Sequence, residues 1–404
     1  MKDVFIHFDI NNFFVGVETL LDPTLRGRAV AVCGAPEKRH GIVLAKSEVA
    51  KKLGVKTGMT IWQAKLLCPD LIIITPHHNE YEKYSKIVQQ IYLQYSDLVE
   101  PFGIDECWVD VTKSLDYFKK TGRELADEVR NRVRTEVGLT ISAGVSWNKT
   151  LAKLGSDMKK PDATTVIDRD VFENVVKKMP VGDMLFIGKK TVAVLERLNI
   201  KTVGDLGNAD PKTLSGHFGV NAYKMVDMAR GVECDPVRPF DYRREVKSVG
   251  NGTTLGVDLK TAAQVYRVAY MLCDQVTTRM RRKGVKGSTI HVSIRNTNLE
   301  WIGAQETLGT PTHSVKTVLG RALAIFNKIW TLPAPVRSLR IAVSNLTRDT
   351  RSQLSLFAEN DEVFNDKISA AFDKIRTKHG TSAIAHGVVD DKIVIEDMDD
   401  MDGD

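Results

Sequence analysis

The stretch Pro101–Thr112, PFGIDECWVDVT, decides how the rest of the chain is interpreted. Its second half has the apolar content of a buried strand, yet it begins with two adjacent carboxylates, Asp105 and Glu106. An unpaired carboxylate is costly to bury, so this pair requires a cation, a proton or a sheltered turn. The neighbouring elements indicate whether a cation, a proton or a turn stabilises the two carboxylates.

Strand-like and helix-like segments alternate around this stretch. DVFIHFDI near the N-terminus has the alternation of a strand, and the segments 80–98 and 121–138 repeat apolar residues at helical spacing. VEPF and DECWVDV predict a hairpin around Gly103, and LTISAGVS predicts a further strand. The order β-α-β-β-α-β is the split ferredoxin-like motif, here with an insertion at about 13–77. In that motif, helices cover one face of an antiparallel sheet and leave the other face available.

The topology predicts that three carboxylates converge. The first and third strands of the motif are its central neighbours, so Asp9 is expected beside Asp105 and Glu106. Consecutive strand residues point to opposite faces, but Gly103 just upstream offers a local twist that brings both acids to one edge. Three carboxylates at one edge suit two Mg²⁺ ions. Each acid alone could equally be a cap or a surface charge; the three together favour the metal site.

Size and composition restrict the class of protein. A chain of 404 residues with 43% hydrophobic residues predicts two to four domains with cores of their own. No apolar run reaches the roughly 18 residues of a membrane span, and the N-terminus does not have the pattern of a signal peptide. Five widely spaced cysteines predict structural thiols in a reducing compartment rather than a metal site. We therefore expect a cytoplasmic, nucleoid-associated protein without a membrane partner.

The charge is distributed unevenly along the chain. The net charge is +6, but residues 358–404 carry 13 acidic and 5 basic residues, whereas residues 243–351 carry 18 Lys and Arg against 6 Asp and Glu. A local excess of this size is typical of a protein that binds a phosphate backbone. A solvated basic surface is the alternative.

Two further regions follow the first motif. Short helices are expected at about 168–231, where the turn Gly188-Lys189-Lys190 has the pattern of a helix-hairpin-helix that directs N–H groups and lysines at a phosphate. An ordinary helical hairpin fits this turn as well. A linker at 232–245 precedes a second α+β domain with four strands and two helices. In the tail, a helix-like segment at about 363–380 is expected to pack back on the body.

Five segments together carry a family resemblance. DINNFF (9–14), GIDECWVDVT (103–112), GVSWNKTLAKLGSDMKKPD (144–162), IGKK (187–190) and QLSLF (353–357) occur in the order and spacing of Y-family translesion DNA polymerases. Over about residues 1–357 the chain resembles the bacterial DNA polymerase IV and polymerase V group.

The resemblance implies an α+β multidomain fold shaped as a right hand. Its parts would be a ferredoxin-like palm, small fingers, a helix-hairpin-helix thumb, a linker, an α+β little finger and a tail, with these bounds: palm 1–12 and 78–167, fingers 13–77, thumb 168–231, linker 232–245, little finger 246–348 and tail 349–404.

The resemblance also implies roles for residues around the acids. Asp9, Asp105 and Glu106 match the catalytic metal-binding acids, for two Mg²⁺ ions per active site. The backbone carbonyl of Ile10 matches a further metal ligand. Phe14 matches the steric gate, an aromatic ring that leaves no room for a 2′-hydroxyl and so rejects ribonucleotides.

The incoming dNTP has its own expected contacts. Lys160 matches the family lysine on the triphosphate, and Lys51 and Phe13 are assigned to the same subsite, although core packing is an alternative for one of the two adjacent rings. The family often has a Tyr and, three residues later, an Arg in the fingers, where this chain has Glu48 and Lys51. Lys51 supplies charge without a bidentate fork, Glu48 would repel phosphate, and nearby Lys46 could compensate.

Primer–template DNA and a sliding clamp are the implied partners of a monomer. The residues expected to contact DNA come from the thumb turn and the basic second domain: Gly188, Lys189, Lys190, Lys247, Ser248, Arg281, Arg282, Lys283, Arg295 and Arg340. QLSLF resembles the motif that binds the clamp β subunit, through Gln353, Leu354, Leu356 and Phe357.

The predicted function is template-directed DNA synthesis. A nucleotidyltransferase with this palm would add dNTPs to a primer 3′-hydroxyl with low fidelity, in translesion synthesis and DNA damage repair. Two alternatives stay open: a catalytically silent DNA- and clamp-binding paralogue, and a nucleotidyl cyclase, which can share the ferredoxin-like palm. Polymerase IV and polymerase V character also both remain open.

Overall fold

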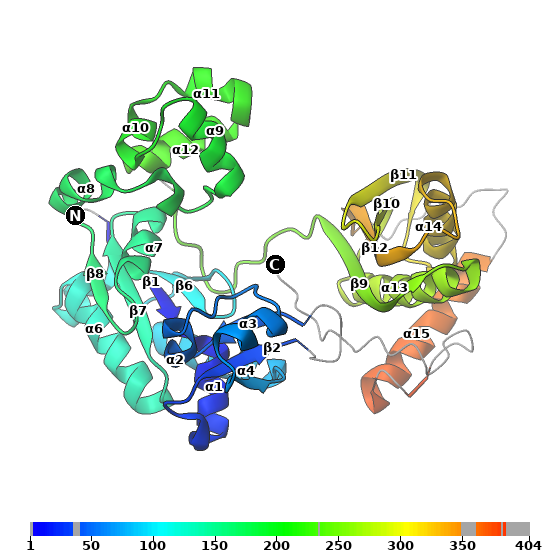
Figure 1. The fold of residues 1–404 in the computed structure, drawn as a ribbon, viewed down its shortest axis with the longest axis horizontal. Coiled ribbons are helices and arrows are strands. Elements are labelled where there is room, and N and C mark those ends of the chain that lie inside the picture. Colours follow the sequence, from blue (N-terminus) through cyan, green and yellow to red (C-terminus); the bar gives the residue numbers. More distant parts are fainter. Residues whose placement is uncertain (1–2, 35–40, 233–234, 349–360, 381–382, 385–404) are drawn as a thin grey trace. The chain divides into compact units, whose positions relative to one another are not determined.

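The computed structural model describes residues 3–34, 41–232, 235–348, 361–380 and 383–384 (Figure 1). The chain divides into two compact units, Met1–Arg243 and Arg244–Asp404. The division lies inside the segment that the sequence predicts as a linker. Within the described residues, no helix is long and apolar enough to cross a membrane.

A five-stranded sheet with the order β5-β6-β1-β7-β8 organises the first unit. Strand β1 is antiparallel to both β6 and β7, whereas β8 joins β7 in parallel. The predicted order of elements and the adjacency of the first and third strands are confirmed, and β8 is an additional edge strand. The strands are β1 (Phe5–Ile10), β5 (Val99–Pro101), β6 (Glu106–Asp110), β7 (Ile141–Ser146) and β8 (Thr164–Val166).

Helices cover both faces of this sheet. The helices α4 (His78–Tyr92) and α6 (Gly122–Arg132) share the apolar core of one face. Helix α7 (Lys149–Met158) covers the other face, and it approaches so closely that a Cβ at Gly144 would lie 1.9 Å from the carbonyl oxygen of Ala152. The expectation that the second face stays available was therefore wrong. All six residues of β1 are buried as a result.

The insertion after β1 forms a small sheet, β3-β2-β4, with its own apolar core. Ser47 and Thr60 cap the two helices that accompany it, each by accepting a backbone N–H. The preceding helix α1 instead contributes side chains to the core of the large sheet. The elements are α1 (Phe13–Leu21), η1 (Pro23–Leu25), β2 (Val30–Cys33), β3 (Val43–Lys46), α2 (Glu48–Lys52), α3 (Ile61–Leu67) and β4 (Ile72–Ile74).

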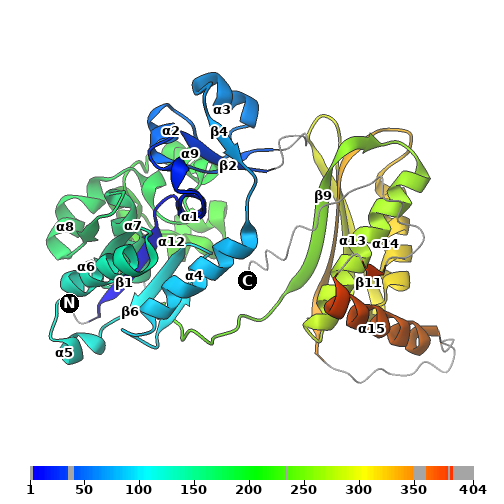
Figure 2. The ribbon, with the colours of Figure 1, turned by 90° about the horizontal axis from the view of Figure 1, so that it is seen from below.

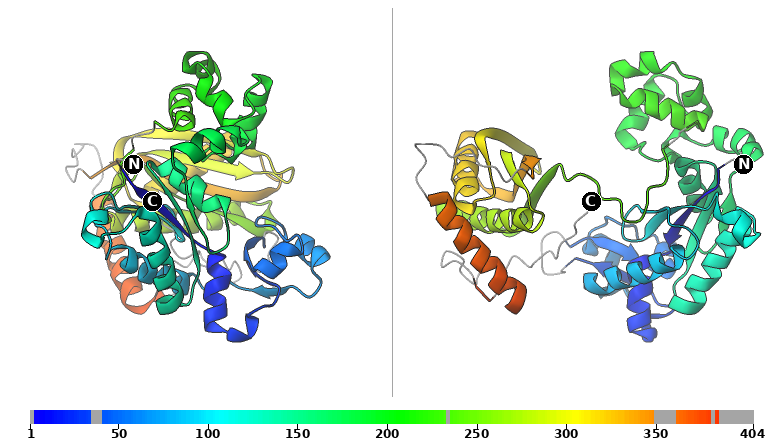
Figure 3. Two further views of the ribbon diagram at one scale, coloured as in Figure 1. Left: turned by 90° about the vertical axis from the view of Figure 1, so that its left-hand side faces the viewer. Right: turned by 180° about the vertical axis from the view of Figure 1, so that it is seen from behind.

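Short helices end the first unit. Helices α9 to α12, drawn in green, gather in a group of their own (Figure 3), and they share an apolar core with α7 and α8. The remaining helical elements of this unit are α5 (Ser114–Phe118), η2 (Val133–Val137), α8 (Arg169–Asn174), η3 (Val176–Lys178), η4 (Val181–Asp183), α9 (Lys189–Arg197), α10 (Val203–Asn208), α11 (Pro211–Phe218) and α12 (Asn221–Arg230).

The second unit contains a four-stranded antiparallel sheet with the order β11-β10-β12-β9. Helices α13 and α14 lie side by side against it (Figure 2). The predicted four strands and two helices are confirmed. They are β9 (Ser248–Leu259), α13 (Ala262–Arg282), β10 (Lys286–Arg295), β11 (Trp301–Thr312), α14 (Val315–Ile329) and β12 (Val336–Thr347).

A further helix, α15 (Asp361–His379), packs on α13. Arg281 on α13 lies 2.6 Å from Asp373, and Arg376 on α15 lies 2.7 Å from Asp274. Each helix thus contributes the arginine to one ion pair and the aspartate to the other, and the four side chains are mostly buried. The expectation that this part of the tail packs back on the body is confirmed. The predicted clamp motif, Gln353–Phe357, lies outside the described residues.

Candidate active site

The pairing of β1 with β6 brings the acids together where β1 ends and β6 begins. We call this end of the two strands, with Asp9, Asp105 and Glu106, the acid edge. Asp9 and Glu106 are direct partners across the two strands. The backbone N–H of Ile10 donates to the carbonyl oxygen of Asp105 at 3.0 Å, which holds Asp105 beside the end of β1. Gly103 adopts a φ of +133°, a conformation that glycine accommodates, two residues before the acid pair.

Asp105 experiences an excess of negative charge. Burial, and then the charges of Asp9 and Glu106, raise the pKa of Asp105 to about 6. A buried carboxyl group with two acidic neighbours is stabilised by a proton or by a nearby cation. The carboxylates therefore interact with each other electrostatically, as the topology predicts.

Two lysines balance the other acids. Burial alone would raise the pKa of Glu106, but hydrogen bonds from His7 and Lys153 lower it to about 2. The Nζ of Lys153 lies 2.5 Å from Glu106 Oε2. Burial raises the pKa of Asp9, although Lys160, with its Nζ 2.6 Å from Asp9 Oδ2, acts in the opposite direction.

Helix α7 supplies a polar face that the sequence analysis missed. Lys149, Lys153 and Ser156 follow one another at helical spacing. Lys149 Nζ lies 2.7 Å from the buried Glu100, and Ser156 Oγ lies 2.8 Å from Nδ1 of His7. The i, i+4, i+7 spacing of these polar residues on an amphipathic helix was the available signal. Only the packing of α7 on the sheet shows what they contact.

The acids fit a divalent cation by their chemistry. Within the described residues, no three His, Cys, Asp or Glu side chains are arranged to hold one metal ion; Glu106 and Asp9 instead point to Lys153 and Lys160. Carboxylate oxygens are nonetheless the hard ligands that Mg²⁺ prefers. The raised pKa of Asp105 also shows a local negative charge that a cation would neutralise.

The two phenylalanines that follow the acid edge have different surroundings. Phe14 is half-buried and stacks on Tyr81, with ring centroids 4.2 Å apart and an angle of 11° between the planes. The hydroxyl of Tyr81 donates to the buried Glu18, so the ring under Phe14 is held in place. Phe13 is only 3% exposed and packs in the core of the large sheet. This burial is the core packing expected for one of the two adjacent rings, and the assignment of Phe13 to the triphosphate subsite stays a prediction.

The segment expected to contact the triphosphate lies close to β1. Asn12 Nδ2 donates to Glu48 Oε1 at 3.1 Å, and Lys51 Nζ lies 3.4 Å from the same oxygen. Burial and the charge of Lys51 lower the pKa of Lys46. Lys46 and Lys51 therefore lie near each other, and Glu48 lies between Lys51 and Asn12.

The predicted DNA contacts of the first unit begin α9. Gly188 is the N-cap residue, and Lys189 and Lys190 are exposed in the first turn. The positive end of the helix dipole thus coincides with two lysine side chains, which suits a phosphate.

In the second unit, Arg295 and Arg340 lie on the sheet. Arg340 is exposed between the buried Leu339 and Ile341, in a row with Gly252 across the strands. It lines a cavity of about 350 Å³ that Trp301 also borders, and Arg295 stacks over that tryptophan with its Cζ 5.7 Å from the ring centroid. Lys247 and Ser248 are exposed at the start of β9.

The basic residues at the end of α13, Arg281, Arg282 and Lys283, lie on the helical layer of the second unit and not on its sheet. Arg281 pairs with Asp373 of α15, and its side chain is 11% exposed. This pairing engages its guanidinium group and disfavours the expected contact of Arg281 with DNA, which stays a prediction. Arg282 and Lys283 follow it on the helical layer and do not lie on the strands that carry Arg295 and Arg340.

Known families match both units of the chain. The model described as the impB/mucB/samB family matches residues 8–157, and the C-terminal domain of the same family matches residues 246–356. A chimeric Y-family DNA polymerase of known structure has a TM-score of 0.74 at 22% identity, over 86% of this chain and 100% of the other. At this identity the likeness shows a shared fold.

Similar full-length proteins lead to the same group. The DNA polymerase IV of Acetivibrio thermocellus is 40% identical over 393 residues, which cover 96% of this chain and 98% of that protein. DNA polymerase IV 1 of Bacillus subtilis is 36% identical over 386 residues, 95% of this chain and 92% of the relative. These names decide between the two groups that the sequence left open. The chain therefore belongs to the Y-family DNA polymerases, in their DNA polymerase IV group.

Proposed function

We propose that this chain is a template-directed DNA polymerase that adds dNTPs to a primer 3′-hydroxyl and carries out low-fidelity translesion synthesis. The observation that supports it most directly is the meeting of Asp9, Asp105 and Glu106 at the β1–β6 edge. The names of the relatives and the two basic surfaces, at α9 and on the second sheet, support the same function.

The proposed catalytic residues would hold two Mg²⁺ ions. Asp9, Asp105 and Glu106, with the backbone carbonyl of Ile10, are the proposed ligands; when bound, the ions activate the primer hydroxyl and neutralise phosphate charge. Lys160, whose Nζ lies 2.6 Å from Asp9 Oδ2, is proposed to contact the triphosphate of a nucleotide bound beside these acids. The protein contributes mainly position and charge, as in other phosphoryl transfers.

Selection of the sugar is assigned to Phe14. Because Phe14 stacks on Tyr81 and Tyr81 is anchored by Glu18, the ring keeps a fixed position close to the acid edge. A fixed ring rejects a 2′-hydroxyl by collision, since it cannot move aside. The small β3-β2-β4 sheet with its two short helices offers little surface to enclose a new base pair, which supports low fidelity.

Primer extension tests the function. With Mg²⁺ and dNTPs, the protein is expected to extend a primer on undamaged and on lesion-bearing templates, and Asp105→Asn should abolish extension without loss of DNA binding. A mobility shift with no extended product would instead identify a silent DNA-binding paralogue. Conversion of NTP in the absence of DNA would identify a cyclase.

The remaining assignments belong to the same proposal. We place the palm at 1–12 and 78–167, the fingers at 13–77, the thumb at 168–231 and the little finger at 246–348. The segment Gln353–Phe357 is proposed to bind a sliding clamp from a cytoplasmic, nucleoid-associated monomer. Deleting this segment should remove stimulation by the clamp while distributive synthesis stays unchanged, and stimulation that survives the deletion would refute the clamp assignment.

A further inference from the structure

Phe186 combines two unfavourable properties at one position. It lies in the loop between η4 and α9, its side chain is 67% exposed, and its backbone has a φ of +66°. A bulky residue is strained in this left-handed region, and a large apolar ring is unfavourable in water. Its neighbours Met184 and Ile187 are buried and hold the loop to the core, so the exposure of Phe186 is not due to a loose loop.

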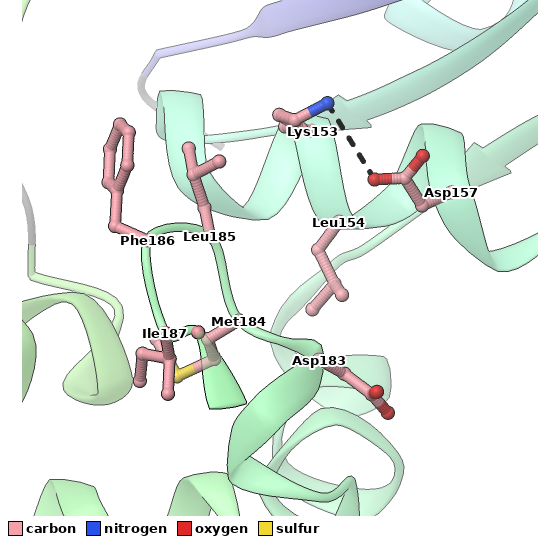
Figure 4. Close-up of a pocket in the computed structure, with 9 residues that line it drawn as sticks. Lys153, Leu154, Asp157, Asp183, Met184, Leu185, Phe186 and Ile187 are labelled. Atoms are coloured by element: carbon pink, nitrogen blue, oxygen red, sulfur yellow. Dashed lines mark ion pairs between the residues drawn. The ribbon is translucent and has the colours of Figure 1, made fainter. Parts of the chain in front are cut away.

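A pocket lies between this loop and helix α7 (Figure 4). Its volume is about 480 Å³, within the usual range for ligand sites. Lys153 and Asp157 line it from the α7 side. The same Lys153 contacts Glu106, and the same Asp157 lies 2.8 Å from Lys160, which contacts Asp9. The pocket therefore shares two residues with the ion pairs of the acid edge.

Phe186 also borders the hairpin that carries the acids. Its ring centroid lies 6.2 Å from that of Phe102, with the planes nearly perpendicular. Phe102 is in the turn of the β5–β6 hairpin, and the Nζ of Lys153 lies 5.8 Å from its ring. This edge contact leaves most of the Phe186 ring uncovered. A ligand that reached the acids along this side of α7 would touch the exposed part of the ring.

The charges around the loop restrict how a nucleic acid strand could lie. Asp157 and Asp183 line the pocket and would repel a phosphate. Lys189 and Lys190, with the N–H groups that begin α9, lie just beyond Phe186 and would attract one. A strand is accommodated if its phosphates face α9 while a sugar or base faces Phe186.

We propose that Phe186 packs against a nucleotide near the 3′ end of the primer strand and so helps to position its terminal hydroxyl at the acid edge. The inference rests on the proposed function, because only the strand whose 3′-hydroxyl reacts must end at Asp105 and Glu106. Phe186 is a positioning residue: it contacts the primer at a distance from the reacting atoms.

Substitution by glycine separates this role from a structural one. Because glycine adopts positive φ without strain, Phe186→Gly should leave the melting temperature unchanged or higher. The same variant should raise the Kd for primer–template about 5- to 20-fold, as expected for loss of one aromatic contact to a nucleotide. Asn199→Gly is the matched control, since Asn199 has a φ of +59° in the same unit and presents no aromatic ring.

Crosslinking identifies the strand in contact. With p-benzoylphenylalanine at position 186, irradiation of the complex should label an end-labelled primer in preference to an end-labelled template. Labelling of the template alone, an unchanged Kd in Phe186→Gly, or a lower melting temperature of that variant would each overturn the inference. The unsubstituted protein is assayed in parallel, because its failure to extend primers would count against the proposed function instead.

Discussion

Lys153 of helix α7 pairs with Glu106, a contact that the sequence pattern of the strands did not predict. Its side chain is 12% exposed, and its ammonium group contacts Glu106, which is the direct partner of Asp9 in the sheet. A carboxylate that loses such a partner while mostly buried keeps its desolvation cost. The position of the Glu106 carboxylate therefore depends on a residue from the opposite layer of the unit.

Lys153→Met should lower both stability and activity. We expect a loss of about 2–3 kcal/mol in the free energy of unfolding, measured by chemical denaturation, and a fall of about tenfold or more in kcat. Lys153→Arg should recover part of each. Lys86→Met is the control, because Lys86 is 73% exposed in a surface pair and its replacement should change stability by less than about 0.5 kcal/mol. Equal losses in the two methionine variants would contradict the role of Lys153.

Asp105 should make the stability of the protein depend on pH. Its pKa of about 6 in the folded state lies above the ordinary value of 3.8, so the folded state binds the proton more tightly than the unfolded state. Its contribution to stability is present below pH 3.8 and is lost as the pH rises through 6. At pH 7.5 the charged Asp105 therefore weakens the fold.

Asp105→Asn should consequently be more stable than the unsubstituted protein at pH 7.5. We expect a gain of up to about 2 kcal/mol, measured in the presence of EDTA, that decreases as the pH approaches 4. The same variant should be inactive in primer extension. A stability difference that does not vary between pH 7.5 and pH 4 would show that Asp105 is not perturbed by its neighbours.

Phe14→Ala should relax sugar selection. Removing the ring leaves space beside Tyr81 for a 2′-hydroxyl, so the ratio of kcat/KM for dNTP to that for rNTP should fall by at least about 100-fold, as expected when a steric exclusion is removed. Single-nucleotide incorporation with matched dNTP and rNTP measures this ratio. Phe14 is not the gate if the ratio of the variant equals that of the unsubstituted protein.

Helix α7 is the element on which the candidate site depends. Its apolar residues enter the cores on either side, and its polar face meets His7, Glu100 and Glu106. The close approach requires Gly144, since an added Cβ would also lie 2.3 Å from the backbone nitrogen of Ser156. Neither backbone atom can move without displacing the helix.

Gly144→Ala should therefore separate α7 from the sheet. We expect a loss of about 3 kcal/mol or more in the free energy of unfolding, similar to severe overpacking of a core, together with loss of extension activity. Gly216→Ala on α11 is the control, because a Cβ there would meet open space among the described residues. Thermal and chemical denaturation of both variants measure the difference, and a native-like Gly144→Ala would refute the close packing.

The molecule as a whole has its basic surfaces on two units. The second unit exposes Arg340 on its sheet, whereas Arg281 is held by α15. Contacts with phosphates release counterions, so the affinity for primer–template should fall steeply as salt increases. Substitutions of Arg340 and Arg281 should therefore affect the salt dependence of DNA binding differently, although both residues belong to the basic segment 243–351.

Arg340→Ala should reduce the slope of log Kd against log salt by about 1, the value expected for one lost phosphate contact. Arg281→Ala should leave the slope unchanged and lower the stability of the second unit, because it leaves Asp373 without this partner. Fluorescence anisotropy over a series of salt concentrations measures both slopes. The assignment of the sheet as the DNA surface fails if Arg281→Ala changes the slope and Arg340→Ala does not.

The amino-acid sequence by itself determined the order of the six elements of the first motif, the four strands and two helices of the second unit, and the meeting of Asp9 with Glu106. This was possible because alternation and helical spacing are local properties, and the topology of the motif leaves few arrangements for its strands. The segments of the resemblance added the proposed role of these acids as metal ligands. None of this information required knowledge of which side chains touch.

Only the tertiary structure decided which face α7 covers, that Phe13 is core while Phe14 stacks on Tyr81, and that Arg281 pairs with Asp373. These outcomes depend on contacts between residues about 50 to 150 positions apart, such as Lys153 with Glu106 and Lys160 with Asp9. A local pattern contains no information about a partner at that distance, because the close packing of whole elements selects it. The exposed ring of Phe186 likewise became visible only when the surrounding core was in place.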